Sequence, residues 1–266
     1  MNDEKVFAKA KTLFEDSESN SYYVLLSRTN LAYSRIENAF NNPFKILLLT
    51  GAPGTGKSYV LRRFYQDHAE LYTIFLYPSA TFGVERLVAI YEKLYGEKLV
   101  IKDLETILSA FRAKEPPPIY ILLDEAQLYS EDQMEWIRVL SNEGIFRFVI
   151  VVHRVGEEDI LAKAHFRTRT FEVVDFKAID QDEVRRFIET KLMLGEMPEY
   201  YDRFKKKALE RIYQLTQGNL RDLNRLMHRI FDLLSYIESQ KPHKLPAWYK
   251  PYLVEMAALE LGMIDG

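Results

Sequence analysis

Residues 51–58 are the first group whose types and spacing could carry out chemistry. They read GAPGTGKS, which fits the pattern Gly-x4-Gly-Lys-Ser/Thr at every fixed position. Glycines remove side chains where a backbone must wrap a polyphosphate, so consecutive N–H groups turn inward at the start of a helix. The lysine would reach the β- and γ-phosphates, and the serine hydroxyl would bind Mg²⁺. An ordinary Gly-rich turn explains the glycines but not the Lys-Ser that follows them.

The elements on either side support a phosphate-binding loop. Residues 46–49 form a short apolar run typical of a buried parallel strand, and a helical pattern begins at residue 59. The expected ligand is therefore ATP with Mg²⁺. The predicted nucleotide-binding residues are those of the loop and the residue after it: Gly51, Ala52, Pro53, Gly54, Thr55, Gly56, Lys57, Ser58 and Tyr59.

A pair of acidic residues completes this chemistry. Asp124 and Glu125 directly follow the apolar run 119–123, which the three prolines before it separate from any helix. Because the carboxyl ends of parallel strands face the ligand crevice, Asp124 could hold the Mg²⁺ shell together with Ser58. Glu125 could orient and polarise the attacking water. An acidic first turn of a helix is the alternative interpretation of the pair.

Further polar residues follow the later strands. His153, with Arg154 beside it, ends the predicted strand 146–152 and is a candidate sensor of the γ-phosphate and the lytic water. Arg167 and Arg169 precede the last predicted strand, from where arginines can reach the nucleotide of a neighbouring subunit. Surface residues without a role at a strand end or on a loop are the alternative for each.

The remaining elements define the fold class. Predicted strands cover 46–49, 73–77, 119–123, 146–152 and 170–174, and helices cover 82–95, 102–114 and 131–141 between them. Amphipathic helices alone follow, at 180–194, 200–217, 219–237 and 246–262. The pattern predicts a P-loop NTPase with a three-layer αβα architecture and a five-stranded parallel sheet, followed by a small all-α lid domain. The expected divisions are 1–44 for N-terminal helices and an adenine-side segment, 45–178 for the core, and 179–266 for the lid.

Four features lie outside the core, and three of them have two possible roles each. Residues 22–26 could cover the adenine base or form an aromatic-rich strand packed on the core. Arg221 opens a helix after Gly218-Asn219 and could lean over bound nucleotide as a lid sensor, or be an ordinary first-turn arginine. The basic run 203–207 is flanked by acidic residues and indicates a solvated face. The C-terminal helix, with Trp248 and Tyr252, could dock a partner or belong to the lid core.

Composition limits the classes of function. The chain has 266 residues, 47% of them hydrophobic, no cysteine and a formal net charge of −3. No apolar run is long enough to span a bilayer and the N-terminus is polar, which together favour a cytoplasmic globular protein. The negative net charge does not favour a constitutive nucleic-acid binder. A local basic patch would be compatible with this net charge.

Taken together, these residues resemble the AAA+ ATPases. The resemblance runs from about residue 22 to residue 237 and rests on the phosphate loop, the Asp-Glu pair, the polar strand end, the arginines before the fifth strand and the Gly-x-x-Arg of the lid. It implies that ATP lies between core and lid. It also implies that a ring or dimer closes when a neighbour's arginine engages the γ-phosphate.

Three stretches are similar to the ExeA-like branch, the general secretion pathway protein A and MshM-like proteins. They are DEAQL at 124–128 with IRVLSN at 137–142, the helix 183–192, and TQGNLRDLNRL at 216–226. Transposition regulators of the TniB and TnsC type share the Asp-Glu-Ala-Gln and lid patterns. Secretion-type relatives carry Gly-Gln where this chain has His153-Arg154, so the first sensor differs.

The resemblance implies an ATPase that couples nucleotide-dependent assembly to a machine for type II secretion, type IV pili or DNA uptake. Longer relatives continue into a membrane span, so a separate membrane protein would supply the anchor and place this chain peripherally at the inner membrane. The alternative is a DNA-bound ATPase of the transposition type. A nucleotide-binding scaffold with negligible turnover is the third possibility.

Overall fold

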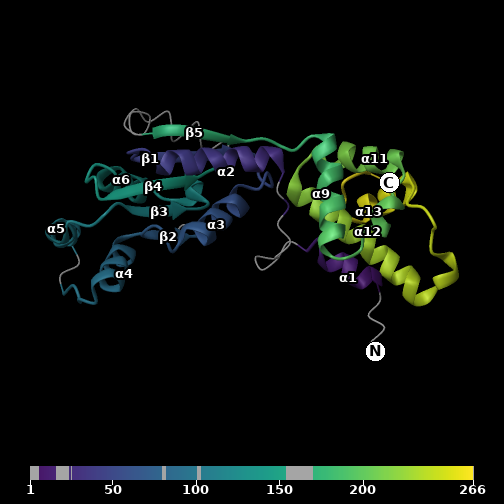
Figure 1. Cartoon of the computed structure of the whole chain (residues 1–266), viewed down its shortest axis with the longest axis horizontal. Helices are drawn as coiled ribbons and strands as arrows, with labels where there is room; N and C mark the ends of the chain where they lie inside the picture. The colour runs from purple at the N-terminus through teal and green to yellow at the C-terminus, as the bar shows by residue number, and fades with distance from the viewer. Residues whose placement is uncertain are drawn as a thin grey trace. The chain divides into compact units, whose positions relative to one another are not determined.

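The computed structural model describes residues 6–15, 24, 26–79, 82–100, 103–153 and 170–265. These residues form two compact units. Residues 31–176 are named the α/β unit, and residues 1–30 with 177–266 are named the helical unit. Figure 1 shows the elements of both.

The α/β unit is built on a five-stranded parallel sheet with strand order β2-β3-β4-β1-β5. The strands are β1 (Ile46–Gly51), β2 (Ile74–Tyr77), β3 (Ile119–Leu123), β4 (Phe146–Val151) and β5 (Thr170–Phe176). Every residue of β1 and β3 is buried, as expected for strands covered on both faces. The predicted fold class and its five strands are confirmed.

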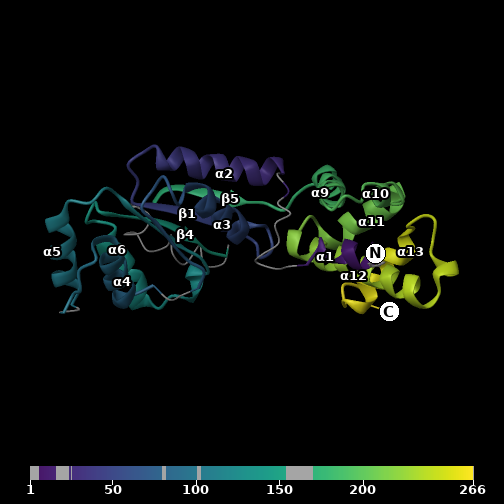
Figure 2. The ribbon, with the colours of Figure 1, turned by 60° about the horizontal axis from the view of Figure 1, so that its bottom comes forward.

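Helices cover both faces of this sheet, which gives three layers. On one face α2 (Ser27–Phe40) and α3 (Lys57–His68) pack on alternate strand residues such as Leu47, Leu122 and Val149. On the other face lie α4 (Val84–Tyr95), α5 (Leu104–Lys114) and α6 (Glu131–Leu140), over Leu48, Ile121 and their neighbours. Figure 2 shows the strands between α2 and the group α4 to α6. Because successive strand side chains alternate between faces, each strand feeds two separate cores.

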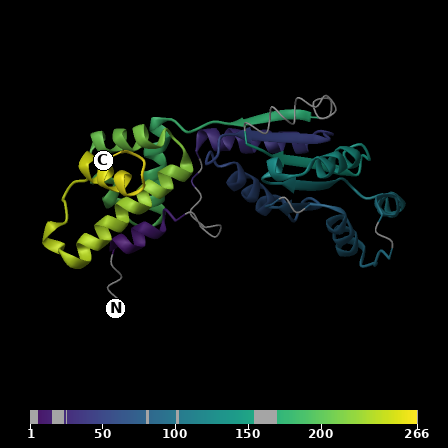
Figure 3. The same ribbon diagram turned by 180° about the vertical axis from the view of Figure 1, so that it is seen from behind.

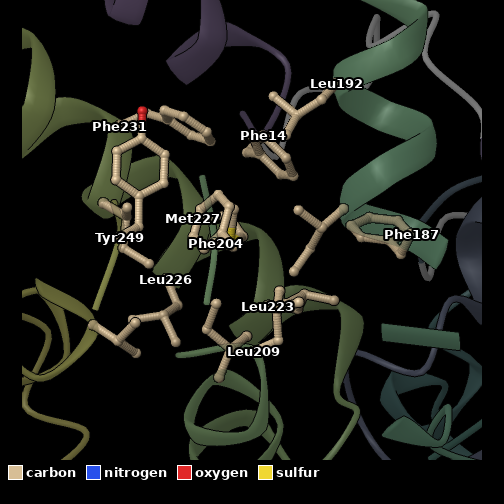
Figure 4. Close-up of a cluster of buried hydrophobic side chains, with 14 of the residues drawn as sticks. Phe14, Phe187, Leu192, Phe204, Leu209, Leu223, Leu226, Met227, Phe231 and Tyr249 are labelled. Carbon is tan, nitrogen blue, oxygen red and sulfur yellow. The ribbon is translucent and has the colours of Figure 1, made fainter. Parts of the chain in front are cut away.

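The helical unit is organised around a second apolar core. Its helices are α1 (Val6–Thr12), α9 (Gln181–Leu194), α10 (Glu199–Asp202), α11 (Lys206–Thr216), α12 (Leu220–Gln240), the short turn η2 (Pro242–Lys244) and α13 (Pro251–Glu260). Figure 4 shows aromatic and aliphatic side chains from several of these segments converging. Phe14 stacks on Phe231 with ring centroids 5.6 Å apart, and Phe204 meets Tyr249 edge-on at 4.8 Å. This packing ties distant parts of the chain together.

The first helix belongs to this second core. α1 lies along α12 (Figure 3), Lys11 pairs with Asp232 at 2.7 Å, and the Lys191 ammonium donates to the Leu13 carbonyl at 2.7 Å. The expected N-terminal segment 1–44 is therefore divided between the two units after Asn30, within α2. The physical reason is the apolar face of α1 with Phe14 behind it, which finds its partners in the helical core and not on the sheet.

Tight backbone contacts fix the start of α12. Gly218 has φ 73°, and a Cβ there would lie 1.8 Å from the Ile179 carbonyl oxygen, so no other residue fits without a shift of the backbone. Asn219 then caps the helix by accepting from the N–H groups of Arg221 and Asp222. The sequence Gly218-Asn219 thus has a structural role in joining α11, α12 and the segment before α9.

Two helices differ from their predicted bounds. The expected helix 200–217 is broken at residues 203–205, because the chain there pairs with Tyr249 through a parallel bridge at Phe204. The expected helix 246–262 begins only at Pro251, since the residues before it form that bridge.

Of segment 22–26, Val24 and Leu26 are buried in the helical core, and the other three residues lie outside the described ranges. Within the described ranges, no helix combines the length and apolarity that crossing a bilayer demands.

Candidate nucleotide-binding site

The phosphate loop connects the central strand to a helix. β1 ends at Gly51, and α3 begins at Lys57 with Gly56 at its N-cap. Gly51, Gly54 and Gly56 have φ of 146°, 78° and 93°, values that side chains rarely tolerate. A Cβ on Gly51 would lie 2.4 Å from the Phe176 carbonyl oxygen on the neighbouring strand. The glycines are thus required by the backbone itself, and they leave the first N–H groups of α3 open to an anion.

Lys57 is buried and folded back on this loop. Its side chain is 5% exposed, and its ammonium donates to the carbonyls of Gly51 at 2.7 Å and Ala52 at 2.9 Å. The Thr55 hydroxyl donates to the same Ala52 carbonyl at 2.8 Å. The loop is therefore shaped by its own side chains, and the lysine charge sits inside the curve where phosphate oxygens would bind.

Ser58 and Asp124 join the loop to the end of β3. The Ser58 hydroxyl is hydrogen-bonded to the Asp124 carboxylate, and the Glu125 N–H donates to the same carboxylate at 2.9 Å. Asp124 is only 3% exposed. Burial raises the pKa of the Asp124 carboxyl, while the hydrogen bond from Ser58, the N–H of Glu125 and the charge of Arg62 on α3 oppose that rise. The sequence interpretation had not singled out Arg62, and nothing in its spacing distinguishes it from other helix arginines.

This pair fits a divalent cation. A buried carboxylate beside a hydroxyl offers two hard oxygen donors, and a cation would stabilise the ionised form that burial disfavours. Among the described residues, no group of three or more His, Cys, Asp or Glu side chains could hold a metal by itself. That donor set suits Mg²⁺, which keeps water and phosphate oxygens in its shell.

Glu125 stands at the centre of a small polar cluster. Its backbone is left-handed, with φ 53° and ψ 38°, which is strained for a residue with a side chain. Its carboxylate accepts a short hydrogen bond from the Gln127 amide and lies 3.2 Å from His153 Nε2. The side-chain amide oxygen of Gln127 accepts a hydrogen bond from the backbone N–H of His153 at 3.4 Å. The ends of β3 and β4 are thus linked through three side chains.

Two of these three were predicted site residues, and Gln127 was quoted only as part of the motif. The structure gives Gln127 contacts to both of the others, which spacing alone did not indicate. His153 Nδ1 is buried without a hydrogen-bond partner among the described residues. The predicted sensor histidine therefore lies next to the predicted catalytic carboxylate.

The other predicted residues are not brought to this cluster by the described structure. Tyr59 lies on the first turn of α3 and is 40% exposed. Arg221 is on the first turn of α12, which belongs to the helical unit and not to the α/β unit that holds the cluster. Arg154, Arg167 and Arg169 lie outside the described residues. Their roles stay predictions.

Comparisons with known proteins agree with this fold. The family model described as an AAA domain matches residues 43–161. No curated protein matches the sequence significantly. The matched segment holds the phosphate loop, the Asp-Glu pair and His153.

Solved structures of similar fold cover nearly the whole chain. Cdc6p from Pyrobaculum aerophilum is 16% identical with a TM-score of 0.64, covering 94% of this chain and 70% of its own. The ORC1 protein of Aeropyrum pernix, solved in complex with DNA, is 15% identical with a TM-score of 0.61. The match covers 94% of this chain and 69% of ORC1. The RuvB Holliday junction branch migration motor of Thermotoga maritima is 15% identical with a TM-score of 0.56. The match covers 94% of this chain and 72% of RuvB. At such identities the likeness shows the fold, which is the P-loop AAA+ fold.

Proposed function

We propose that this AAA+ chain binds ATP with Mg²⁺ and hydrolyses it to ADP and phosphate. The observation that carries the proposal is the hydrogen bond between Ser58 of the phosphate loop and Asp124 at the end of β3. It brings the predicted phosphate-binding and cation-binding groups to one point. The adjacent Glu125 then lies beside the position of a γ-phosphate held by the loop.

Each residue has a distinct task in this proposal. The N–H groups around Gly54 and Gly56 bind the phosphates, and Lys57 exchanges its contacts with the Gly51 and Ala52 carbonyls for phosphate oxygens. When bound through Ser58 and Asp124, Mg²⁺ supplies charge neutralisation at the phosphate oxygens. The remaining predicted residues, Ala52, Pro53, Thr55 and Tyr59, shape the phosphate loop and the start of α3.

Glu125 accepts the proton of the attacking water. A carboxylate held by Gln127 and His153 has a defined direction, so a water bound to it would be oriented for attack on the γ-phosphate. His153 is then the sensor residue, since its ring contacts the same carboxylate oxygen. Arg167 and Arg169 are proposed to act on a neighbour's nucleotide, and Arg221 on the nucleotide from the lid.

Hydrolysis is proposed to control assembly. Contacts to the γ-phosphate exist only before cleavage, so a ring or dimer closed by them would open afterwards. The three stretches similar to ExeA-like proteins favour a partner in a secretion, pilus or DNA-uptake machine, reached through a membrane protein. A DNA-bound role of the TniB and TnsC type is the alternative, favoured by the DNA complex and the branch migration motor among structures of the same fold.

ATP turnover and light-scattering mass, with and without duplex DNA over a salt series, test both levels of the proposal. Phosphate release by the wild type, and its loss in Glu125→Gln with ATP binding retained, are expected. Equal turnover in wild type and Glu125→Gln would overturn the site assignment. Assembly that needs ATP and ignores DNA supports the machine partner, whereas assembly driven by DNA and lost steeply with salt supports the alternative.

A further inference from the structure

Two distant segments of the helical unit meet in a short parallel bridge. Phe204 pairs with Tyr249, the Lys205 N–H donates to the Tyr249 carbonyl at 3.1 Å, and the Tyr249 N–H donates to the Arg203 carbonyl at 2.7 Å. Phe204 and Tyr249 are both buried in the core. Because side chains alternate along extended backbone, their neighbours point the other way, toward solvent. The outer side of the bridge therefore carries Lys205, Trp248 and Lys250, which are all exposed.

This outer side is strongly basic. Segments 203–209 and 241–254 contain seven of the chain's 36 Lys and Arg residues and none of its 39 Asp and Glu residues, although the whole chain has a net charge of −3. Lys206 and Lys207 open α11, whose first turn has no acidic residue. Cations at the positive end of a helix are unfavourable, so an external anion would relieve them. The flanking Glu210 lies 3.9 Å from Lys206 in an exposed pair, which offsets little of this charge.

Exposed aromatic and apolar side chains adjoin the basic ones. The Lys205 ammonium lies 3.4 Å from the centroid of the Trp248 ring. From there α13 exposes Tyr252, Met256 and Leu259, spaced so that they share one face of the helix. Of the fifteen exposed large hydrophobic residues in the described ranges, four fall within residues 248–259. The acidic residues of α13 are already paired, Glu255 with Arg211 and Glu260 with Arg229.

We propose that this surface, defined as Lys205, Lys206, Lys207, Trp248, Lys250, Tyr252, Met256 and Leu259, docks directly on an anionic lipid bilayer. Lysines that attract anionic headgroups, an aromatic ring at the interface and apolar side chains entering the acyl boundary are the three components such a surface needs. A nucleic-acid backbone would match the lysines but would leave Met256 and Leu259 in water. The inference is independent of ATP hydrolysis and concerns a different surface from the phosphate loop.

Vesicle co-sedimentation of the full chain tests the proposal, using phosphatidylcholine vesicles with and without phosphatidylglycerol. Binding is expected only to the anionic vesicles and is expected to fall with salt. The charge variant Lys206→Gln/Lys207→Gln should bind roughly 25-fold more weakly, since each lysine near such a surface contributes about fivefold. The apolar variant Met256→Gln/Leu259→Gln should also bind more weakly at unchanged charge.

Matched controls separate this surface from general effects. Lys93→Gln/Lys98→Gln removes the same charge from the α/β unit, and Leu71→Gln/Val100→Gln removes two exposed apolar residues there. Both should bind vesicles as the wild type does. In a Trp136→Phe background, the emission of Trp248 should shift to the blue on binding. ATP turnover in solution should be equal in all variants, so failure of the proposed ATPase function would be seen separately.

Three outcomes would overturn the proposal. Equal binding to zwitterionic and anionic vesicles would remove the role of the lysines. Vesicle binding that ignores the apolar variant, together with duplex DNA binding that depends on the lysines, would assign the surface to nucleic acid. A light-scattering mass that falls in the apolar variant without vesicles would assign the surface to contact between copies of this chain.

Discussion

Among the residues that the structure describes, two lysines are buried, one in each unit, and their surroundings differ. Lys57 and Lys191 are 5% and 4% exposed, and both donate to backbone carbonyls at 2.7 Å. Lys57 donates to carbonyls of its own loop, five and six residues earlier in the chain. Lys191 joins α9 to the Leu13 carbonyl and, at 3.0 Å, to Asn224 of α12.

The surroundings of the two lysines explain the difference. Lys191 lies 5.3 Å from the Phe14 ring centroid and 5.0 Å from that of Phe187, so its charge is held by two aromatic faces as well as by hydrogen bonds. Lys57 sits beside glycines in left-handed conformations and near an aspartate whose pKa burial raises. The buried charge of Lys191 thus joins distant segments of one unit, whereas that of Lys57 lies in the loop proposed to bind phosphate.

The largest expected effect is on nucleotide binding. Lys57→Ala should weaken ATP binding roughly 100-fold or more, because a buried charge that pairs with phosphate is lost. Titration calorimetry of the variant against ATP with Mg²⁺ measures this. Lys98→Ala, an exposed lysine of the same unit, should bind as the wild type does, and equal affinity in both variants would contradict the comparison.

The second effect is on stability, where substitution of Lys191 should cost more than substitution of Lys57. Lys191→Met should lower the free energy of unfolding of the helical unit by about 2–4 kcal/mol, since the Leu13 carbonyl and Asn224 lose a buried donor. Lys57→Met should lower stability by less than Lys191→Met does, because the hydrogen bonds to the Gly51 and Ala52 carbonyls lie within one loop. Urea unfolding followed by circular dichroism compares them, with exposed Lys207→Met as control. Equal losses in the two buried variants would remove the distinction.

A smaller effect is expected at the carboxylate cluster. Gln127→Leu should reduce kcat about tenfold with little change in KM, because the amide positions Glu125 and touches no phosphate in the proposed pose. Steady-state phosphate release measures both constants, and Gln127→Asn tests whether a side chain that keeps the amide donor restores activity. Exposed Gln240→Leu is the control. A rise in KM at constant kcat would show that Gln127 serves binding instead.

The smallest effect concerns pH. Because burial raises the folded pKa of Asp124 above its unfolded value, the stabilising contribution is that of the protonated form, and it is lost as pH rises through the folded pKa. At neutral pH, Asp124→Asn should therefore be slightly more stable than the wild type. The gain should shrink as the pH falls toward about 4, the ordinary range of Asp. Urea unfolding of the wild type and the variant, at neutral pH and at about pH 4, measures this gain in stability. A gain that is the same at both pH values would contradict a titrating Asp124.

Much of the α/β unit could be predicted because its signals are local. Runs such as 119–123 are apolar without alternation, which is what strands buried on both faces require, and their order follows from the fold class. The glycines of the phosphate loop and the Lys-Ser after them specify a backbone shape and a charge within eight residues. The structure places Ser58 and Asp124 together as their positions at a helix start and a strand end imply.

The contacts that could not be predicted join residues far apart in sequence. Nothing near residue 13 indicates that its carbonyl will accept from Lys191, and nothing in the run 203–207 indicates that Trp248 and Lys250 will lie beside it. The flanking acids led to an interpretation of that run as a solvated face. Its partner segment becomes visible only when the bridge at Phe204 and Tyr249 is formed.

The sequence by itself determined the phosphate loop, the acidic strand end, the parallel sheet and the change to helices near residue 180, because each depends on residue type and short spacing. Tertiary structure alone decided that α1 joins the helical unit, that Gln127 links Glu125 to His153, and that Lys205 lies against the Trp248 ring. The physical reason is that packing energy is gained between surfaces, whatever their separation along the chain, whereas sequence patterns report only the environment of each segment.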